Sequence, residues 1–155
     1  MDYYLQALQT MHYILNSQNN PNAWFENWVE WISKDITDWE FRQNTGHHIR
    51  AYGGMGSFND LPQIRGGNGN YSIIFDFLRS FCYRFAHLYG KVNKPLDELE
   101  EEILHDICNA DHHPYKVGNE QVTDAGTLLK NKVVNEQVTD YLRAGTLLKN
   151  IDVIR

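Results

Sequence analysis

The sequence predicts an all-α protein, a compact bundle of about five or six helices around a glycine-rich central loop. Two observations predict this class. Apolar residues recur at spacings of three and four in several segments, and glycine- or asparagine-rich stretches separate those segments. A chain of 155 residues suits one core and buries roughly two-thirds of its unfolded surface. We expect a helical domain at residues 1–113 and a C-terminal segment at residues 114–155.

The first predicted helix carries one apolar stripe and ends at the polar run 16–20. The stripe consists of Tyr4, Leu8, Met11 and Leu15. Asn20 followed by Pro21 is typical of an N-cap with proline at the first helical position, so a second helix is expected there. Its apolar face favours burial in the core, and comprises Trp24, Trp28, Trp31 and Ile32.

The end of the second helix is expected among three acidic residues, and residues 41–51 are expected to form another short helix. The acidic residues are Asp35, Asp38 and Glu40. Residues 65–70 (RGGNGN) predict a loop, because glycine and asparagine tolerate positive φ.

Two further helices follow this loop. The apolar spacing between Ile74 and Leu88 predicts a long helix, with Gly90 at the position of a C-terminal glycine cap. Pro95 opens the next helix, in which apolar residues face inward and acidic residues face outward. Cys82 and Cys108 lie within these helices and are expected to be small apolar residues rather than a disulfide.

The C-terminal segment contains a near-identical tandem repeat, KVGNEQVTDAGTLLKN at residues 116–131 and KVVNEQVTDYLRAGTLLKN at residues 132–150. The first copy lacks the Tyr-Leu-Arg of the second, a little less than one helical turn, so the copies cannot present the same faces throughout. Two such similar copies indicate a recent duplication or an artefact of the sequence. We expect only the second copy to pack as a native element.

The net charge of −6 comes from one local feature. Residues 95–111 contain seven Asp or Glu and no Lys or Arg, which leaves 13 acidic against 14 basic residues elsewhere. No basic cluster suited to nucleic acid appears. The acidic helix is either a solvated surface or a docking surface for a basic partner. If it docks a partner, its contacts are expected from Asp97, Glu98, Glu101, Glu102 and Asp106.

The glycine-rich stretch at residues 47–61, HHIRAYGGMGSFNDL, allows two interpretations. Its backbone N–H groups could form an anion-binding nest, although no phosphate-loop or dinucleotide motif accompanies it. The alternative is a tight turn in which glycines reverse the chain and Phe58 and Leu61 fix the loop to the core. Its residues are Tyr52, Gly53, Gly54, Gly56, Ser57, Phe58, Asn59 and Asp60, with Ser57 or Asn59 as a cap and His48 or Arg50 as an ion-pair partner for Asp60.

The seven histidines raise the question of a metal site. The pairs His47-His48 and His112-His113 are adjacent, and no H-x-x-x-H or H-E-x-x-H spacing occurs. Adjacent helical residues point about 100° apart, so each pair can supply one natural ligand. Ser57 lacks a nucleophile-elbow motif, and Cys82 is expected to be buried. We therefore expect no metal, no cofactor and no catalytic residue.

The motif YGGMGSFNDL at residues 52–61 resembles that of a family of small, uncharacterised bacterial helical proteins. The resemblance extends over about residues 3–90, with a Trp-bearing helix before the motif and an aromatic helix after it. Members of that family resemble the immunity proteins of contact-dependent and polymorphic toxin systems. The resemblance implies an inhibitor without catalytic residues, whose partner is a cognate toxin.

Together these observations predict a cytoplasmic binding protein that neutralises a toxin, such as a basic nuclease, through its acidic helix. No apolar run approaches the roughly 20 residues of a membrane span, and no signal peptide is recognisable. Neither membrane nor nucleic acid is expected as a direct partner, and the oligomeric state stays open. The alternative is a small metal- or phosphate-dependent enzyme built around His47, His48, Ser57, Asn59 and Asp60.

Overall fold

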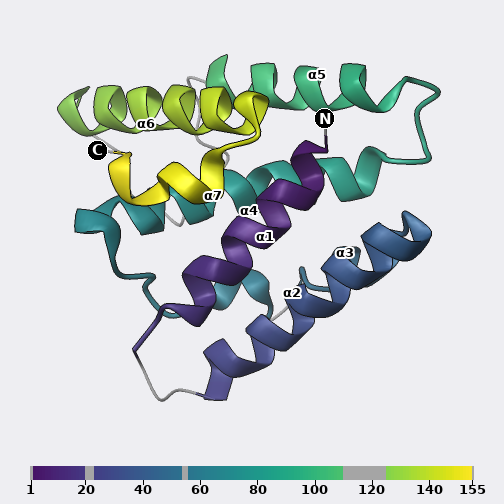
Figure 1. The fold of residues 1–155 in the computed structure, drawn as a ribbon, viewed down its shortest axis with the longest axis horizontal. Helices are drawn as coiled ribbons and strands as arrows, with labels where there is room; N and C mark the ends of the chain where they lie inside the picture. Colours follow the sequence, from purple (N-terminus) through teal and green to yellow (C-terminus); the bar gives the residue numbers. More distant parts are fainter. Residues whose placement is uncertain (1, 20–22, 54–55, 110–124, 155) are drawn as a thin grey trace.

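The computed structural model describes residues 2–19, 23–53, 56–109 and 125–154. These residues form seven α-helices and three short 3₁₀ turns, without a strand, so the all-α class is confirmed (Figure 1). The helices are α1 (Tyr3–Asn16), α2 (Ala23–Arg42), α3 (Gly46–Ile49), α4 (Asn70–Leu88), α5 (Leu96–Asn109), α6 (Ala125–Ala144) and α7 (Leu147–Asn150). The 3₁₀ turns are η1 (Phe58–Asp60), η2 (Gly67–Gly69) and η3 (Ile151–Val153).

Helix α1 lies at the centre of the bundle and packs against α2, α4 and α7. Figure 1 shows it running obliquely between α2 and the edge formed by α5 and α6. The predicted stripe is fully buried, from Tyr4 to Leu15. Asp2 caps the helix by accepting from Leu5 N at 2.9 Å, and its second carboxylate oxygen accepts from Trp39 Nε1 at 2.7 Å. This carboxylate therefore joins the start of α1 to α2.

Helix α2 is longer than the sequence predicts. It runs to Arg42 instead of ending among the acidic residues, and only Gly46–Ile49 of the expected helix at 41–51 forms. Two of these acidic side chains are paired: Asp38 with Lys34 and Arg42, four residues away on either side, and Asp35 with both histidines of α3. Glu40 is exposed and lies two residues before the end of the helix. The chain leaves α2 at Gln43, where φ is 46°. The predicted Asn20-Pro21 cap lies outside the described residues.

The loop before α4 requires glycine for steric reasons. Gly67 has φ of 59°, and a Cβ added there would lie 2.4 Å from the Tyr71 ring. Helix α4 then carries the predicted apolar stripe, which is buried from Ile74 to Phe85, whereas Leu88 is 38% exposed. Gly90 after the helix has φ of 81°, as expected near a helix C-terminus. The predicted long helix and the glycine after its C-terminus are therefore both confirmed.

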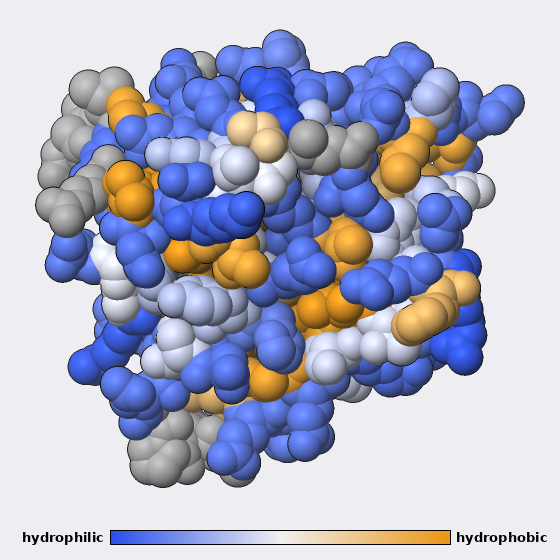
Figure 2. All heavy atoms as spheres, in the orientation of Figure 1, coloured by the Kyte–Doolittle hydropathy of each residue, from blue (hydrophilic) through white to orange (hydrophobic). Residues whose placement is uncertain are grey.

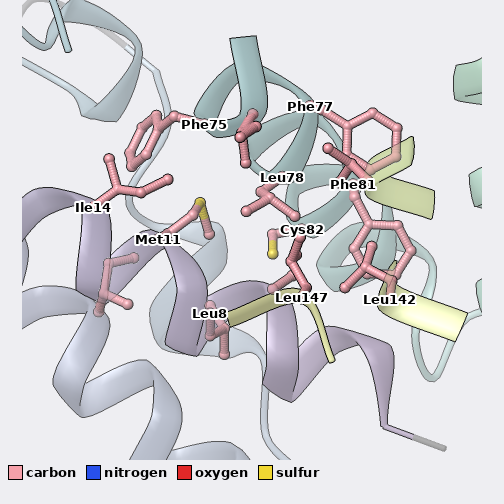
Figure 3. Close-up of a cluster of buried hydrophobic side chains, with 14 of the residues drawn as sticks. Leu8, Met11, Ile14, Phe75, Phe77, Leu78, Phe81, Cys82, Leu142 and Leu147 are labelled. Carbon is pink, nitrogen blue, oxygen red and sulfur yellow. The ribbon is translucent and has the colours of Figure 1, made fainter. Parts of the chain in front are cut away.

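The C-terminal helices complete the same core. Figure 3 shows Leu142 of α6 and Leu147 of α7 meeting side chains of α1 and α4, with Cys82 among them. Cys82 and Cys108 are both free, and burial raises the pKa of each thiol. Asn70 Nδ2 at the start of α4 donates to the carbonyl of Ile154 at 2.5 Å. The described part of residues 114–155 thus packs onto the helices of residues 1–113.

The second repeat copy is described throughout, whereas residues 116–124 of the first lie outside the described residues. In the second copy Val134, Val138, Leu142 and Leu147 are buried. The heptapeptide AGTLLKN occurs in both copies with two local structures: residues 125–131 are continuous helix, whereas residues 144–150 contain a break. Identical residues therefore adopt different backbones in the two places.

The break in the second copy is a glycine-terminated helix end. Gly145 has φ of 70°, its N–H donates to Leu142 O at 3.0 Å, and Thr146 N–H donates to Tyr141 O at 3.0 Å. With its amide oxygen turned toward α7, Gln6 of α1 accepts from the N–H groups of Thr146 and Leu147 at 3.1 and 2.8 Å. A side chain of α1 therefore caps α7.

The surface is mainly polar on the face shown in Figure 2, with apolar residues in a broken band. Phe41 and Val153 are the most exposed large apolar residues described, at 80% and 64%. No helix in the described ranges is long and apolar enough to cross a membrane.

Candidate functional site

The glycine-rich loop is a self-contained turn. Gly53 and Gly56 have φ of 99° and 78°, and Ser57 caps η1 by accepting from Asn59 N at 3.3 Å. Phe58 is fully buried, whereas Leu61 is partly buried. The positive φ of Gly53 and Gly56 and the burial of Phe58 agree with the tight-turn interpretation, whereas the expected burial of Leu61 is only partial, and residues 54–55 lie outside the described residues. Gly56 N–H already donates to Asp60 Oδ2 at 2.9 Å, so it is not an open donor of an anion-binding nest.

The expected ion pair of Asp60 with His48 or Arg50 is wrong for His48. Asp60 binds the Gly56 N–H within its own loop, whereas His48 Nδ1 lies 2.8 Å from Asp35 Oδ2. The reason is that α3 packs against α2, where Asp35 contacts both histidines. Asp35 is buried, and no local sequence signal marked it as a partner for histidine.

A buried polar network joins α2, α3 and α4. Asp35 Oδ1 is 2.5 Å from His47 Nδ1, and its other oxygen contacts His48. His48 Nε2 is 2.7 Å from the Tyr52 hydroxyl, which also lies 3.3 Å from the Arg79 carbonyl. The His47 ring stacks on Trp31, with ring centroids 4.0 Å apart. One carboxylate with two oxygens can therefore contact both histidines of an adjacent pair. From the sequence, each pair was considered only as the source of one metal ligand, and this arrangement was not predicted.

The network fixes the glycine-rich loop to the helices. Tyr52 lies between His48 and the carbonyl of Arg79, and Arg79 donates through Nη1 to Phe58 O at 3.1 Å. Both ends of the loop therefore connect to α4 through Arg79. Because the Tyr52 hydroxyl has one proton, it donates either to His48 or to the Arg79 carbonyl. Such a network orients side chains, and it leaves neither nitrogen of His48 open for another ligand.

The residues of the alternative enzyme site do not form one cluster of hydrogen bonds. His47 and His48 contact Asp35, whereas Ser57 and Asp60 bond backbone N–H groups of the loop. In the described part of the chain, no three His, Cys, Asp or Glu side chains are grouped to hold a metal ion. His112 and His113 lie outside the described residues.

Two hollows flank Gly53. The first, of about 340 Å³, lies between α2 and the glycine-rich loop, and we call it the tryptophan pocket. Its side chains are Trp24, Asn27, Trp28, Trp31, Arg50 and Ser57. The second, of about 560 Å³, lies between the loop and α4 and includes Tyr52, Tyr83, Arg84 and His87. Trp24 and Trp31 therefore line a hollow instead of being fully buried, whereas Trp28 and Ile32 are buried as predicted.

The predicted partner-binding carboxylates all lie on α5, outside the core. Asp97, Glu98, Glu102 and Asp106 are exposed, and Glu101 is partly exposed. Glu101 and Glu102 contact cations outside the helix: Arg143 Nη2 lies 2.8 Å from Glu101, and Lys94 Nζ lies 2.6 Å from Glu102. The hydrogen bond from Arg143 lowers the pKa of Glu101.

Glu100 contradicts the expectation that the acidic residues of this helix face outward. It is fully buried and accepts from Tyr4 N at 2.8 Å, at the start of α1. Burial raises the pKa of its carboxyl from 4.5 to about 8. The signal was present in the sequence, since residue 100 lies four positions after Leu96 and three before Ile103 on the apolar stripe.

A family model described as a domain of unknown function (DUF6966) matches residues 23–72. The matched segment contains α2, α3, the glycine-rich loop and the first residues of α4, and α5 lies beyond it. No curated protein and no solved structure matches the chain. The chain is thus similar to that domain over the segment that carries the buried histidine network and the tryptophan pocket.

Proposed function

We propose that this chain is a binding protein that neutralises a cognate bacterial toxin in the cytoplasm, as immunity proteins do. The acidic face of α5, defined as Asp97, Glu98, Glu101, Glu102 and Asp106, is the proposed docking surface. The observation that carries the proposal is that these carboxylates line the outer side of a helix whose inner side is fixed in the core by Leu99, Ile103 and Leu104. Because the helix is fixed, its backbone needs no ordering on binding.

A positively charged protein surface is the complementary partner. A concentrated negative patch accelerates association with a basic protein and repels nucleic acid, which carries phosphate charges of the same sign. A basic nuclease toxin has the required charge. An inhibitor of this kind covers the nuclease surface and needs no catalytic group of its own.

The ion pairs of Glu101 with Arg143 and of Glu102 with Lys94 determine which variants can test this surface. Reversing either charge would also break a contact with Arg143 or Lys94. Glu98 and Asp106 are exposed on the same helix, so their reversal changes the charge without removing those two contacts. The informative variant is therefore Glu98→Lys combined with Asp106→Lys.

The experiment is co-expression and co-purification with the product of an adjacent toxin gene, followed by binding kinetics. We expect association of the double variant to slow by about tenfold or more at low salt, with a smaller difference at high salt. The matched control is Glu30→Lys with Glu40→Lys, which reverses two exposed charges on α2. Equal binding by both double variants at low salt would contradict the acidic-face interface, and absence of any complex would contradict the inhibitor function.

A further inference from the structure

The carboxylate of Asp35 is buried between two imidazole rings. Its oxygens lie 2.5 Å from Nδ1 of His47 and 2.8 Å from Nδ1 of His48, and its side chain is 0% exposed. Because a carboxylate only accepts hydrogen bonds, both rings donate through Nδ1–H. The two rings therefore have the same tautomer, and the proton on Nε2 of each ring determines the charge of the cluster.

No Lys or Arg in the described structure balances the charge of Asp35. Lys34 and Arg42 pair with Asp38, at 3.2 and 3.1 Å, and the ion-pair partners of Asp35 are the two histidine rings. A buried charge without a partner of opposite sign is strongly unfavourable. If both rings were neutral, the cluster would contain such a charge. A second proton on one of the two rings removes this cost.

The surroundings favour His47 as the ring that carries the second proton. It stacks on Trp31, with ring centroids 4.0 Å apart, and the face of an indole attracts a cation. The His47 side chain is 10% exposed and that of His48 is 0% exposed, so a charge on His47 loses less hydration. Asp38 is a second carboxylate near this ring. Burial raises the pKa of Asp38, but Lys34 and His47 are among the groups that bring it below its ordinary value.

His48 is satisfied as a neutral ring. Its Nε2 lies 2.7 Å from the Tyr52 hydroxyl, which can donate to it. Tyr4 of α1 and Cys82 of α4 also face the cluster, but burial raises the pKa of both groups, so both are uncharged near neutral pH. The guanidinium of Arg79, beyond Tyr52, pairs with a carboxylate of its own helix. The other charged side chains that face the cluster belong to α2 and are Asp38, Lys34 and Arg42.

We propose that Asp35, His47 and His48 form a proton-operated latch. A proton on His47 neutralises the cluster and holds α3 on α2, and release of this proton at alkaline pH frees α3 together with the glycine-rich loop that follows it. Helix α3 has only four residues, so its position depends on such tertiary contacts. All three latch residues lie within residues 23–72, the segment matched by the family model. The latch goes beyond the proposed function and does not involve α5.

The direction of the pH dependence follows from the proton count. The closed latch binds one proton more than the open state, in which His47 has lost its carboxylate partner. The latch is therefore closed in mildly acidic and neutral solution. As the pH rises, the ratio of open to closed molecules increases by up to tenfold for each pH unit, as long as opening releases the proton.

Long-range ¹H–¹⁵N NMR spectra of the imidazole nitrogens measure the protonation of each ring directly. At pH 7 we expect His47 to carry protons on both nitrogens and His48 to carry one on Nδ1 only. His47→Gln identifies the signals of His47. A neutral His47 at pH 7, or two cationic rings, would overturn the proposal.

Amide hydrogen exchange measures the opening of the latch. The reporters are the N–H groups of Ile49, Ala51 and Tyr52, which donate to carbonyls of residues 45–49. From pH 7 to pH 8 we expect their protection, corrected for the intrinsic exchange rate, to fall by about tenfold in the parent. The amides of α4 report global unfolding at the same pH and separate it from local opening. Unchanged protection of the three reporters in the parent would overturn the latch.

Two variants assign the effect to the cluster. In His47→Gln the protection of the three reporters should not depend on pH, because the titrating ring is absent. His105→Gln removes an exposed histidine of α5, whose side chain is 74% exposed, and should retain the tenfold change of the parent. The same pH dependence in both variants would overturn the assignment to His47.

Discussion

Replacing Glu100 with Gln tests the buried carboxyl between α1 and α5. The Glu100 side chain is fully buried, and its pKa rises from 4.5 to about 8 in the folded protein. The folded state then holds the proton more tightly than the unfolded state. The stabilising contribution of the protonated carboxyl is therefore complete below about pH 4.5 and is lost as pH rises through about 8.

The magnitude follows from the size of the shift. At about 1.36 kcal/mol per pKa unit, the change from 4.5 to about 8 corresponds to roughly 3–5 kcal/mol in the free energy of unfolding. Glutamine has nearly the same shape, stays neutral, and keeps an oxygen to accept from Tyr4 N. We expect Glu100→Gln to be about as stable as the parent near pH 5 and several kcal/mol more stable near pH 9.

Urea denaturation between pH 5 and 9 measures this difference. Glu98→Gln, an exposed carboxylate on the same helix, is the matched control and should change the free energy of unfolding by less than about 0.5 kcal/mol at every pH. Other shifted groups, such as Asp38 and Glu101, are common to all three proteins and cancel in the comparison. A stability difference between Glu100→Gln and the parent that did not change with pH would refute the reasoning.

Three further predictions concern stability and reactivity. Asp35→Ala should cost about 3–5 kcal/mol in urea denaturation, because it removes the shared partner of two largely buried histidines; a cost below about 1 kcal/mol would contradict the network's role. Gly67→Ala should lower the melting temperature more than Gly69→Ala. Both residues have positive φ, but an added Cβ would meet the Tyr71 ring at residue 67 and nothing within 4 Å at residue 69, so equal losses would count against this contact. In the native protein a thiol reagent should modify Cys108 and spare the fully buried Cys82, and rapid labelling of both would show that the core opens.

Much of the fold follows from local patterns. The apolar stripes of α1, α4 and α5 and the turn residues Gly53 and Gly56 were all predictable, because a 3.6-residue period and a positive φ are properties of short segments. The end of α2 was not. Helix α2 continues to Arg42, and Asp35 within it is paired across the fold with His47 and His48, a contact that no local pattern indicates.

The candidate sites divide in the same way. Sequence reasoning located the acidic face of α5 and the turn around Phe58 but placed Glu100 on the wrong side of its helix. It also treated the tryptophans of α2 as core, whereas Trp24 and Trp31 border a hollow shared with Arg50. A pocket depends on how a loop from elsewhere in the chain packs against a helix. The apolar periodicity of that helix carries no information about this packing.

The sequence by itself determined that this chain is a set of amphipathic helices joined by glycine turns, because apolar spacing and glycine content act locally. Only the tertiary structure decided which backbone conformation the same heptapeptide adopts in each copy of the repeat. The heptapeptide AGTLLKN is unbroken helix at residues 125–131 and turns at Gly145 in the second copy, at residues 144–150. There, Gln6 of α1 caps the next helix and Leu147 enters the core, so packing against a distant helix selects the turn.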